Sequence, residues 1–584
     1  MKKNVIIESI SISLKILPSK YRIKSLLLLA GIVVNSILDL LSLAAILPIL
    51  ALILKPGFIQ ESESLSFTYH ALEFTDEKIF IVSICAIIFL FIVSKNLFGL
   101  WIQRSQMRFI WSAYESISKD MLRSIYKKGY SYFNENNSNK ILNRIITVPQ
   151  NFSQSLLVQI ILFISEFLML VLIITSLALY DYKILITLAL IVIPVFLLFY
   201  NLTKKRIAYY FARLNALSPL VRKPVFEIVF GYVDVVIGNV FNSFENAYQD
   251  KIRESKKIKI ILNTIQSIPN RLVEICVILA VLTILIYGLY YLQDPEKIIA
   301  MLSVFALAAY RALPSINRLM LALMNVKGQM FNLKIMEEFL PHNESNKVVQ
   351  LGDFQNSIKI NQLSFQFPNS EFPLLKEINL VVKKGESIGI VGKSGSGKTT
   401  LINILLGFVD NYNGNIEIDG VKLEQHNLAS WQNKIGYVRQ DVFLIDGSIR
   451  DNVAFGIPAD KVDENRLKKS LEKAQLLEFV ENLPEKFDTL IGERGSKISG
   501  GQRQRIGIAR ALYHEAKVLL FDEATSALDD ETETEITEAI RSLQNENLTM
   551  IIVAHRKSTL KYCDRIIKIE KGEIKPFDNA LQNK

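Results

Sequence analysis

Apolar residues form long runs in the first part of the chain and short runs broken by polar residues in the second part. Six runs are long enough to cross about 30 Å of bilayer hydrocarbon, which takes about 20 helical residues. They cover residues 25–54, 79–101, 156–180, 184–200, 271–293 and 298–326. The pattern predicts a helical membrane domain of six spans, followed by a water-soluble domain.

The connections between these runs differ in length. Residues 181–183 join the third run to the fourth, and residues 294–297 join the fifth to the sixth, so both pairs should form tight hairpins. The second and fourth connections are long and charged, and their helical pattern should extend the spans well beyond the bilayer. We expect turns near residues 130–141 and 221–231, where these extensions would dock on the soluble domain.

Lys and Arg concentrate on one side of the expected membrane domain. They are frequent before residue 25 and in the second and fourth connections, whereas the other connections carry only one or two cations each. Cytoplasmic loops of membrane proteins carry such an excess. The bias places the N-terminus and the soluble domain on the cytoplasmic side of the inner (plasma) membrane. It also accounts for the net charge of +10 without a nucleic-acid partner.

The patterns divide the chain into consecutive segments. Residues 1–24 contain an alternating stretch that predicts an amphipathic helix in the membrane surface. Residues 25–340 form the membrane domain, the polar residues 341–357 a linker, and residues 358–584 the soluble domain. Cys85, Cys276 and Cys563 have neither metal-ligand nor CxxC spacing, and we interpret them as packing residues.

The soluble domain contains a phosphate-binding loop. A buried strand at residues 388–391 leads into a glycine-rich segment at 392–399 that matches the pattern GxxxxGK[ST], and an apolar helix follows. Backbone N–H groups of such a loop close around phosphate oxygens, while Lys398 supplies positive charge and Thr399 a hydroxyl for Mg²⁺. The candidate ATP-binding residues of the loop are Gly392, Lys393, Ser394, Gly395, Ser396, Gly397, Lys398, Thr399 and Thr400.

A second apolar strand, at residues 518–522, ends in two carboxylates. Asp522 stands at the strand end, where it would bind Mg²⁺, and Glu523 follows it as a general base for the attacking water. Together with the phosphate-binding loop, this strand predicts hydrolysis of ATP and not binding alone. The soluble domain is therefore expected to have the α/β fold of P-loop NTPases.

Residues 498–502, Ile-Ser-Gly-Gly-Gln, resemble the LSGGQ signature of ABC ATPases, with Ile in place of the usual Leu. Segments 489–495 and 526–529 resemble the X-loop and D-loop of that family and occur in the expected order. With the six runs before them, these motifs make the chain resemble ABC exporters over nearly its whole length. The resemblance implies an exporter-type membrane domain fused to an ABC ATPase.

The same resemblance assigns roles to three residues outside the loop and the signature. Phe367 lies where an aromatic residue stacks on adenine, although Tyr is commoner there. Gln440 follows a strand as the Q-loop residue that reaches ATP and Mg²⁺, and His555 follows another strand as the switch histidine that acts with Glu523 in catalysis.

In ABC exporters the signature of one copy completes the ATP site of a second copy. Ser499, Gly500, Gly501 and Gln502 would therefore contact ATP held by the partner. Because the signature and both catalytic residues are intact, we expect a homodimer with two working sites. A heterodimer remains an alternative.

Ionisable residues within the apolar runs are costly in hydrocarbon and should face a cavity, an interface or a partner. One interpretation is structural pairing, as between Arg271 and Glu274 one helical turn apart. The other is a cationic cavity for an anionic substrate. The residues concerned are Asp39, Lys95, Glu166, Arg271, Glu274, Arg311 and Arg318.

Residues 304–320, with 165–166 and 269–274, resemble the lipid-linked oligosaccharide flippases among ABC exporters. That resemblance implies a cavity for the substrate's pyrophosphate lined by Lys95, Arg271, Arg311 and Arg318. We therefore hypothesise transfer of a polyprenyl-pyrophosphate glycan to the outer leaflet, for protein glycosylation or surface-polysaccharide assembly. The alternative is export of another lipid, such as one like lipid A, or of a drug or a peptide.

Overall fold

The fold is described from a computed structural model of the whole chain. It describes residues 5–46, 59, 63–71, 73–74, 76–180, 182–287, 290, 295–339, 349–368, 370–522, 530–544, 546–554 and 556–576. Contacts divide the chain into two compact units, Met1–His342 and Asn343–Lys584. The first unit is helical and the second contains both sheets.

Most of the described part of each predicted span falls in one long helix of the first unit. In chain order these helices are α2 (Ser19–Ala44), α6 (Glu77–Lys127), α10 (Val158–Tyr180), α11 (Tyr182–Phe230), α13 (Phe241–Tyr287) and α14 (Pro295–Glu338). Within the described residues, four helical stretches are long and apolar enough to cross a membrane: Ser19–Ala44, Glu77–Lys127, Ser138–Leu179 and Phe241–Ile286.

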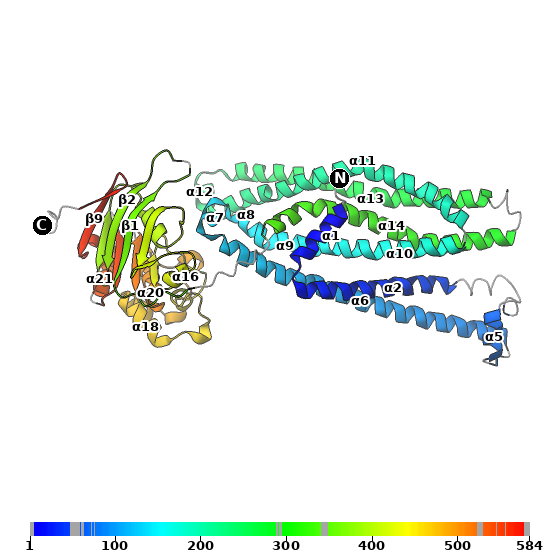
Figure 1. Cartoon of the computed structure of the whole chain (residues 1–584), viewed down its shortest axis with the longest axis horizontal. Helices are drawn as coiled ribbons and strands as arrows, with labels where there is room; N and C mark the ends of the chain where they lie inside the picture. The colour runs from blue at the N-terminus through cyan, green and yellow to red at the C-terminus, as the bar shows by residue number, and fades with distance from the viewer. Residues whose placement is uncertain are drawn as a thin grey trace. The chain divides into compact units, whose positions relative to one another are not determined.

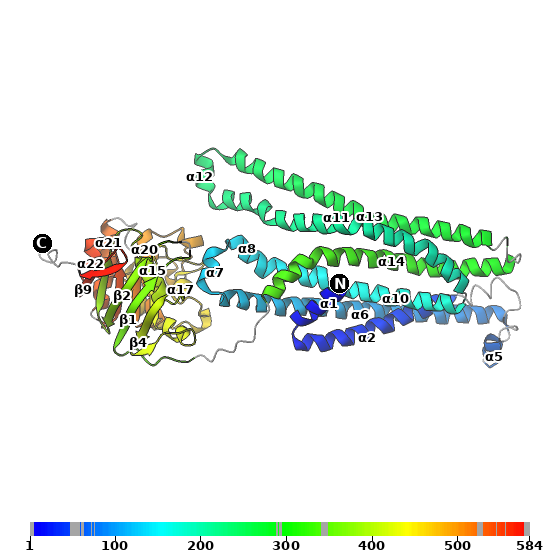
Figure 2. The same cartoon turned by 45° about the horizontal axis from the view of Figure 1, so that its top comes forward.

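The long helices pack in pairs, α2 with α6, α10 with α14 and α11 with α13 (Figures 1 and 2). Helix α6 has 51 residues, which at 1.5 Å per residue gives a length of about 75 Å. This is more than twice the thickness of the hydrocarbon. The prediction that the second connection continues a span as a helix is therefore confirmed, and α11 and α13 extend the fourth and fifth spans in the same way.

The first predicted turn is present as two short helices, α7 (Gly129–Glu135) and α8 (Ser138–Leu142). The second prediction is wrong, because α11 continues through residues 221–230 and the chain reverses only afterwards, around α12 (Tyr232–Ile237). The break falls at Gly231, where a Cβ atom would lie 2.8 Å from the carbonyl oxygen of Glu227. A side chain at this position would therefore force a local shift of the backbone.

Two π-helical stretches precede α10 that the sequence did not lead us to expect. They are η1 (Asn143–Thr147) and η2 (Asn151–Leu157), with α9 (Val148–Gln150) between them. Phe152 and Leu156 of η2 are buried in a core that also includes Ile125 of α6 and Leu333 of α14. The wider turns thus place large apolar side chains where these helices meet.

Two short helices also belong to the first unit. Helix α5 (Glu63–Ala71) lies in the first connection. Helix α1 (Val5–Ile16) forms where an amphipathic helix was predicted. Its Ile12 and Ile16 are buried and its Ser9 hydroxyl contacts the sulfur of Met330 in α14 at 3.1 Å, while Ile7 is exposed.

The second unit contains two sheets. The four-stranded sheet has the order β2-β1-β4-β5, with β1 (Ser357–Phe365), β2 (Leu375–Lys383), β4 (Asn413–Ile418) and β5 (Val421–Lys422). The six-stranded sheet has the order β10-β9-β3-β8-β7-β6, and its strands are parallel except for β10. They are β3 (Ser387–Val391), β6 (Ile435–Val438), β7 (Val518–Asp522), β8 (Thr549–Val553), β9 (Arg565–Glu570) and β10 (Glu573–Pro576).

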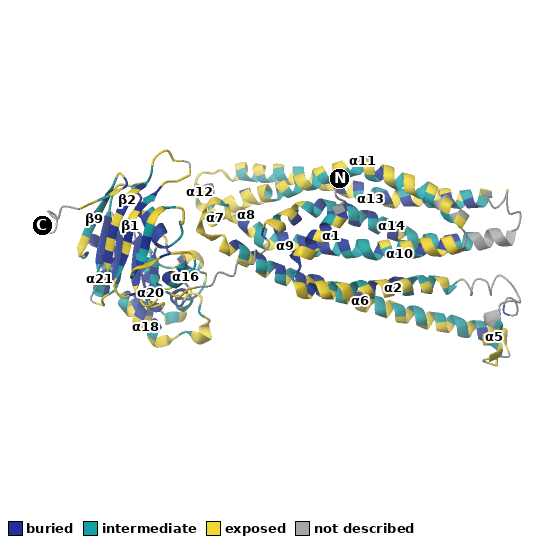
Figure 3. Ribbon diagram, viewed as in Figure 1, coloured by how far each residue is buried: buried dark blue, intermediate teal, exposed yellow. Residues whose placement is uncertain are grey.

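Helices cover the larger sheet, and its central strands are buried (Figure 3). One core packs α15 against the two sheets and encloses Trp431, whose indole N–H donates to the carbonyl of Leu405 at 2.8 Å. A second core packs α18, α20 and α21 around β7. The helices are α15 (Lys398–Leu405), α16 (Leu428–Gln432), α17 (Ile449–Val453), α18 (Glu464–Lys473), α19 (Leu477–Glu481), α20 (Gly500–Tyr513), α21 (Asp530–Gln544) and α22 (Lys557–Leu560).

Candidate functional site: a nucleotide-binding loop and a charge cluster in the membrane helices

The glycine-rich loop lies between β3 and α15, as the sequence predicts. Strand β3 has parallel neighbours on both sides, β8 and β9, so the loop emerges from the middle of the sheet. Gly395 and Gly397 have φ angles of +77° and +101°, which only glycine adopts without strain. At Gly392 a Cβ atom would lie 2.6 Å from the carbonyl oxygen of Ile569. The glycines are therefore required by the path of the backbone.

Lys398 is the first residue of α15, and only 4% of its surface is exposed. Its ammonium donates to the carbonyl oxygens of Gly392 at 2.9 Å and Lys393 at 3.2 Å. These bonds fold the side chain back across the loop, so its charge lies beside the backbone groups that would surround a phosphate. The N-terminus of α15 adds the positive end of a helix dipole.

Thr399 and Asp522 come together from different elements. The Thr399 hydroxyl donates to a carboxylate oxygen of Asp522 at 3.3 Å, and Tyr437 of β6 donates to the other oxygen at 3.3 Å. Hydroxyl and carboxylate oxygens are the ligands that Mg²⁺ prefers, so this pair fits a magnesium ion shared with phosphates. Among the described residues no group of three or more His, Cys, Asp and Glu could hold a metal on its own.

Ser499 is the N-cap of α20, and the signature residues form its first turn. The Ser499 hydroxyl accepts from the backbone N–H of Gln502 at 3.2 Å, and the Gln502 side chain accepts from the backbone N–H of Ser499 at 2.9 Å. This capping box uses the side chain of Gln502 within its own helix. The exposed Ser499 and the first turn of α20 thus form the start of a helix, which is a favourable place for an anion.

Gln504 is a residue of this site that the sequence analysis missed. Its side-chain amide donates to the carbonyl oxygens of Arg439 at 3.2 Å and Gln440 at 2.5 Å. The signature helix therefore holds the backbone of the Q-loop. Residues 502–505 alternate Gln and Arg, and no local pattern distinguishes the glutamine that bonds to a loop 64 residues away.

Of the remaining predicted nucleotide-site residues, the structure describes Phe367 and Gln440. Phe367 lies two residues beyond the end of β1, is 50% exposed and makes a T-shaped contact with the ring of Phe365. Gln440 is exposed. Glu523, His555 and the D-loop segment 526–529 lie outside the described residues, and their roles stay predictions.

In the membrane helices, two of the predicted cavity cations share one partner. Lys95 of α6 and Arg311 of α14 contact different carboxylate oxygens of Asp39 in α2, at 2.6 and 2.7 Å. The three side chains are between 16% and 26% exposed. The Nε atom of Arg311 is buried and has no hydrogen-bond partner among the described residues. This cluster carries two positive charges against one negative charge.

The other two predicted cations have separate partners. Arg318 of α14 contacts Glu166 of α10 at 2.7 Å, and the Glu166 side chain is only 8% exposed. Arg271 contacts Glu274 at 3.5 Å on the same helix, where both side chains are more than half exposed. The pairing expected between Arg271 and Glu274 is confirmed. All four cations are paired in this structure, and only Lys95 and Arg311 share a carboxylate.

Comparisons with known proteins agree with the nucleotide-binding site described above. Residues 375–526 match the sequence profile of the family described as "ABC transporter". The chain is 43% identical over 228 residues to the ATP-dependent lipid A-core flippase of Desulfotalea psychrophila, which covers 39% of each chain. It is also 43% identical over 220 residues to a putative multidrug export ATP-binding/permease protein of Staphylococcus aureus, covering 38% of each. The aligned region thus spans about two fifths of these relatives.

One solved structure matches nearly the whole chain. A bacterial Atm1-family ABC exporter with ATP bound superposes with a TM-score of 0.74 and covers 94% of both chains at 20% sequence identity. The chain therefore has the ABC exporter fold, and the predicted fold class is confirmed. Four helical stretches of its described residues are long and apolar enough to cross a membrane, and residues 375–526 of its second unit match the ABC transporter profile.

Proposed function

We propose that this protein is an ATP-driven flippase that moves a phosphorylated glycolipid from the cytoplasmic to the outer leaflet of the inner membrane. The observation that carries the proposal is the cluster of Asp39, Lys95 and Arg311, which leaves surplus positive charge among membrane helices. Because a charged side chain among membrane helices is costly, it indicates a functional site or a binding partner. A nucleotide-binding loop on the same chain would supply the energy.

In the ATP site, Lys398 and the backbone N–H groups of residues 392–397 would bind the phosphates of ATP. Thr399 and Asp522 would hold Mg²⁺, with Gln440 as a further expected ligand, and the ion supplies charge neutralisation on the phosphate oxygens. Glu523 would accept a proton from the attacking water, with His555 beside the γ-phosphate. Phe367 would stack on the adenine.

A second copy of the chain would complete each ATP site. The exposed Ser499 at the start of α20 would face the γ-phosphate bound by the partner, where the helix N-terminus favours negative charge. A homodimer is the simplest assembly, because one chain carries both the loop and the signature.

In the membrane domain, the cargo's phosphate would take the place of Asp39. A phosphate group can carry more negative charge than a carboxylate and offers several oxygens, so it would bind Lys95 and the fork of Arg311 together. Asp39 would neutralise these cations while no cargo is present. Arg318 and Arg271 are the other proposed contacts, and each would first have to leave its own carboxylate.

Two phosphorylated glycolipids fit this chemistry. The resemblance of residues 304–320 to lipid-linked oligosaccharide flippases favours a polyprenyl-pyrophosphate glycan. The names of the relatives from Desulfotalea psychrophila and Alkalilimnicola ehrlichii, both lipid A-core flippases, favour a lipid A-like cargo instead. The similarity to the lipid A-core flippases is the better supported of the two, because it extends over more than 200 residues.

Reconstitution in liposomes tests the proposal. We expect a polyprenyl-pyrophosphate glycan or lipid A-core to stimulate ATP hydrolysis and to change leaflet, and whichever does so identifies the cargo. Arg311→Ala should abolish the stimulation, whereas Arg206→Ala, an exposed arginine of α11, should not. Unchanged transport by the Arg311 variant would contradict the proposal that this arginine binds the phosphate of the cargo. Stimulation by amphipathic drugs alone would favour a multidrug exporter, which is how the Staphylococcus aureus relative is named.

A further inference from the structure

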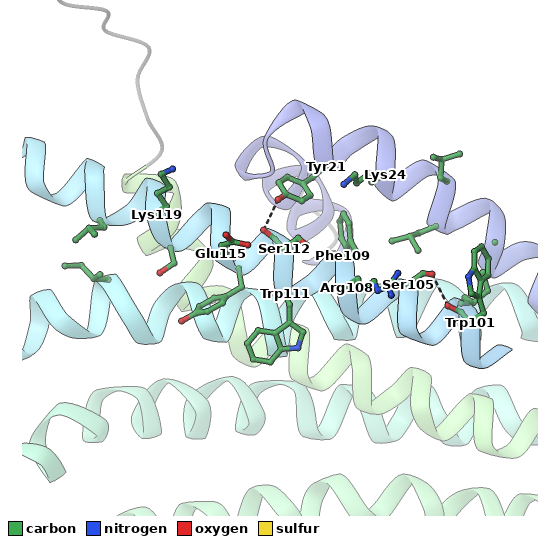
Figure 4. Close-up of a pocket in the computed structure, with 18 residues that line it drawn as sticks. Tyr21, Lys24, Trp101, Ser105, Arg108, Phe109, Trp111, Ser112, Glu115 and Lys119 are labelled. Carbon is green, nitrogen blue, oxygen red and sulfur yellow. Dashed lines mark hydrogen bonds between the residues drawn. The ribbon is translucent and has the colours of Figure 1, made fainter. Parts of the chain in front are cut away.

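A groove of about 1280 Å³ lies between α2 and α6, on a part of the membrane domain that the proposed transport does not use (Figure 4). Its lining includes none of the four predicted cavity cations. The two helices approach closely at one end, where a Cβ atom on Gly31 would lie 2.6 Å from the side chain of Ile102. Away from this point the helices leave room between them.

The groove is apolar at one end and basic at the other. Leu27, Gly31 and Ile102 line the end where the helices converge. Toward the start of α2 the lining is basic, with Lys24 from α2 and Arg108 and Lys119 from α6. Figure 4 shows Lys24 beside the stretch of α6 that carries Ser105 and Arg108.

The charges of the groove are unbalanced. It contains one carboxylate, Glu115, and the three cations Lys24, Arg108 and Lys119. None of these four groups forms an ion pair within the described part of the chain, although the Lys24 ammonium lies 5.8 Å from the ring centre of Tyr21. Three exposed cations beside an apolar surface are complementary to an amphiphile with an anionic head.

Two of the three cations, Lys24 and Arg108, lie near the level expected for lipid headgroups. Lys24 immediately precedes the first predicted span, and Arg108 follows the end of the second by seven residues, or about 10 Å of helix. Trp101 and Trp111 of the same lining are 61% and 53% exposed. Tryptophan is enriched at this level of a bilayer. The apolar end then extends into the hydrocarbon.

We propose that the groove between α2 and α6 binds an anionic phospholipid of the cytoplasmic leaflet. Its phosphate would lie between Lys24 and Arg108, within reach of the hydroxyls of Ser105 and Ser112. One acyl chain would run along Leu27 toward Gly31. This lipid is a resident of the surrounding membrane and is distinct from the transported cargo.

Native mass spectrometry of the full-length protein in detergent tests this site, with phosphatidylglycerol as the probe and phosphatidylcholine for comparison. Lys24→Ala combined with Arg108→Ala should weaken phosphatidylglycerol binding about 30-fold, because each cation near a lipid surface contributes about 1 kcal/mol. Phosphatidylcholine binding should change much less. Ser105→Trp, which fills the groove and keeps both cations, should weaken binding of both lipids.

Lys205→Ala combined with Arg206→Ala is the matched control. It removes one lysine and one arginine that are exposed just beyond the predicted fourth span and do not line the groove. The control should keep wild-type affinity. Equal losses in both double variants, no loss in the groove variant, or displacement of phosphatidylglycerol by a phosphorylated glycolipid in direct competition would each overturn the proposal.

Discussion

At the scale of single residues, the nucleotide site combines groups that a local pattern reveals with groups that it does not. Lys398, Thr399 and Asp522 stand in short motifs beside predicted strands, and the structure places all three at the same end of the sheet. Tyr437 was missed because it lies 85 residues before Asp522 on a neighbouring strand. Its contact depends on strand order, which a local motif does not encode.

Asp522 and Tyr437 should differ in their effect on ATP hydrolysis. We expect Asp522→Asn to lower hydrolysis about 100-fold or more, because it removes negative charge aimed at Mg²⁺. Tyr437→Phe removes only one hydrogen bond to the same carboxylate and should cost between about 2-fold and 10-fold. Phosphate release from the purified protein with Mg²⁺ measures both, and equal losses would contradict the assigned roles.

Asp39 was recognised from the sequence as a charge in an apolar run, but its partners were not. Lys95 and Arg311 lie 56 and 272 residues from it, so no periodicity connects them. The sequence therefore left open both structural pairing and a cationic cavity. The structure shows that these charges are paired. Because two cations share one carboxylate, a cationic cavity is still proposed.

Removal of the Asp39 charge should destabilise the membrane domain. Asp39→Asn leaves Lys95 and Arg311 without a counterion; breaking a fully buried pair costs about 3–5 kcal/mol, and this partly buried cluster should lose less. Glu274→Gln is the control, because its pair with Arg271 is exposed and should be worth less than about 1 kcal/mol. Thermal unfolding in detergent should show a clearly lower Tm for the first variant only. A similar Tm in both variants would contradict the role of Asp39 as the shared counterion.

Cys563 should be unreactive in the folded protein. Burial raises the pKa of its thiol to about 12, with a smaller contribution from the neighbouring Asp564, and only 4% of the residue is exposed. Almost no thiolate is then present at pH 8. Mass spectrometry after maleimide treatment should find Cys563 unmodified in the native protein and modified after denaturation. Rapid native labelling would show that it is not packed as described.

At the scale of elements, the hydrophobic pattern predicted the long helices and several strands of the soluble domain, and it failed at some boundaries. The runs of apolar residues located the long helices, and strands β3, β7 and β8 were expected because buried parallel strands are continuously apolar. The end of α11 was misplaced, since the helix continues to Phe230 and α12 begins at Tyr232. The π-helical turns η1 and η2 depend on packing against other helices, which periodicity does not report.

The bond from α20 to the Q-loop gives a test at this scale. Gln504→Ala should lower ATP hydrolysis several-fold, because the signature helix would no longer hold the backbone at Arg439 and Gln440. It should also cost about 1–3 kcal/mol of stability. Gln432→Ala breaks a single bond from an exposed glutamine to the carbonyl of Leu406, and it should cost less stability and leave hydrolysis per folded molecule unchanged. Equal activity of the two variants would contradict the role of Gln504.

At the scale of the whole molecule, the two-part organisation could be predicted because each part has its own sequence pattern. The membrane runs and the ATPase motifs occupy separate stretches, and the exporter fold confirms their combination. The cargo could not be derived in the same way, because apolar helix faces carry no readable motif and the aligned region of the named relatives spans about two fifths of their length. The proposed assembly also extends beyond one chain, since the signature is proposed to act on a partner's ATP.

The central claim is that ATP hydrolysis in the second unit drives movement of a phosphorylated glycolipid through the first. The most direct test measures both processes in the same proteoliposomes, with lipid A-core and a polyprenyl-pyrophosphate glycan as separate cargoes, for the wild-type protein and for Glu523→Gln. The account predicts that the wild type hydrolyses Mg-ATP and transfers one of these lipids, and that the variant binds ATP but does neither. Equal lipid transfer by both proteins, or transfer by the wild type without ATP, would contradict it.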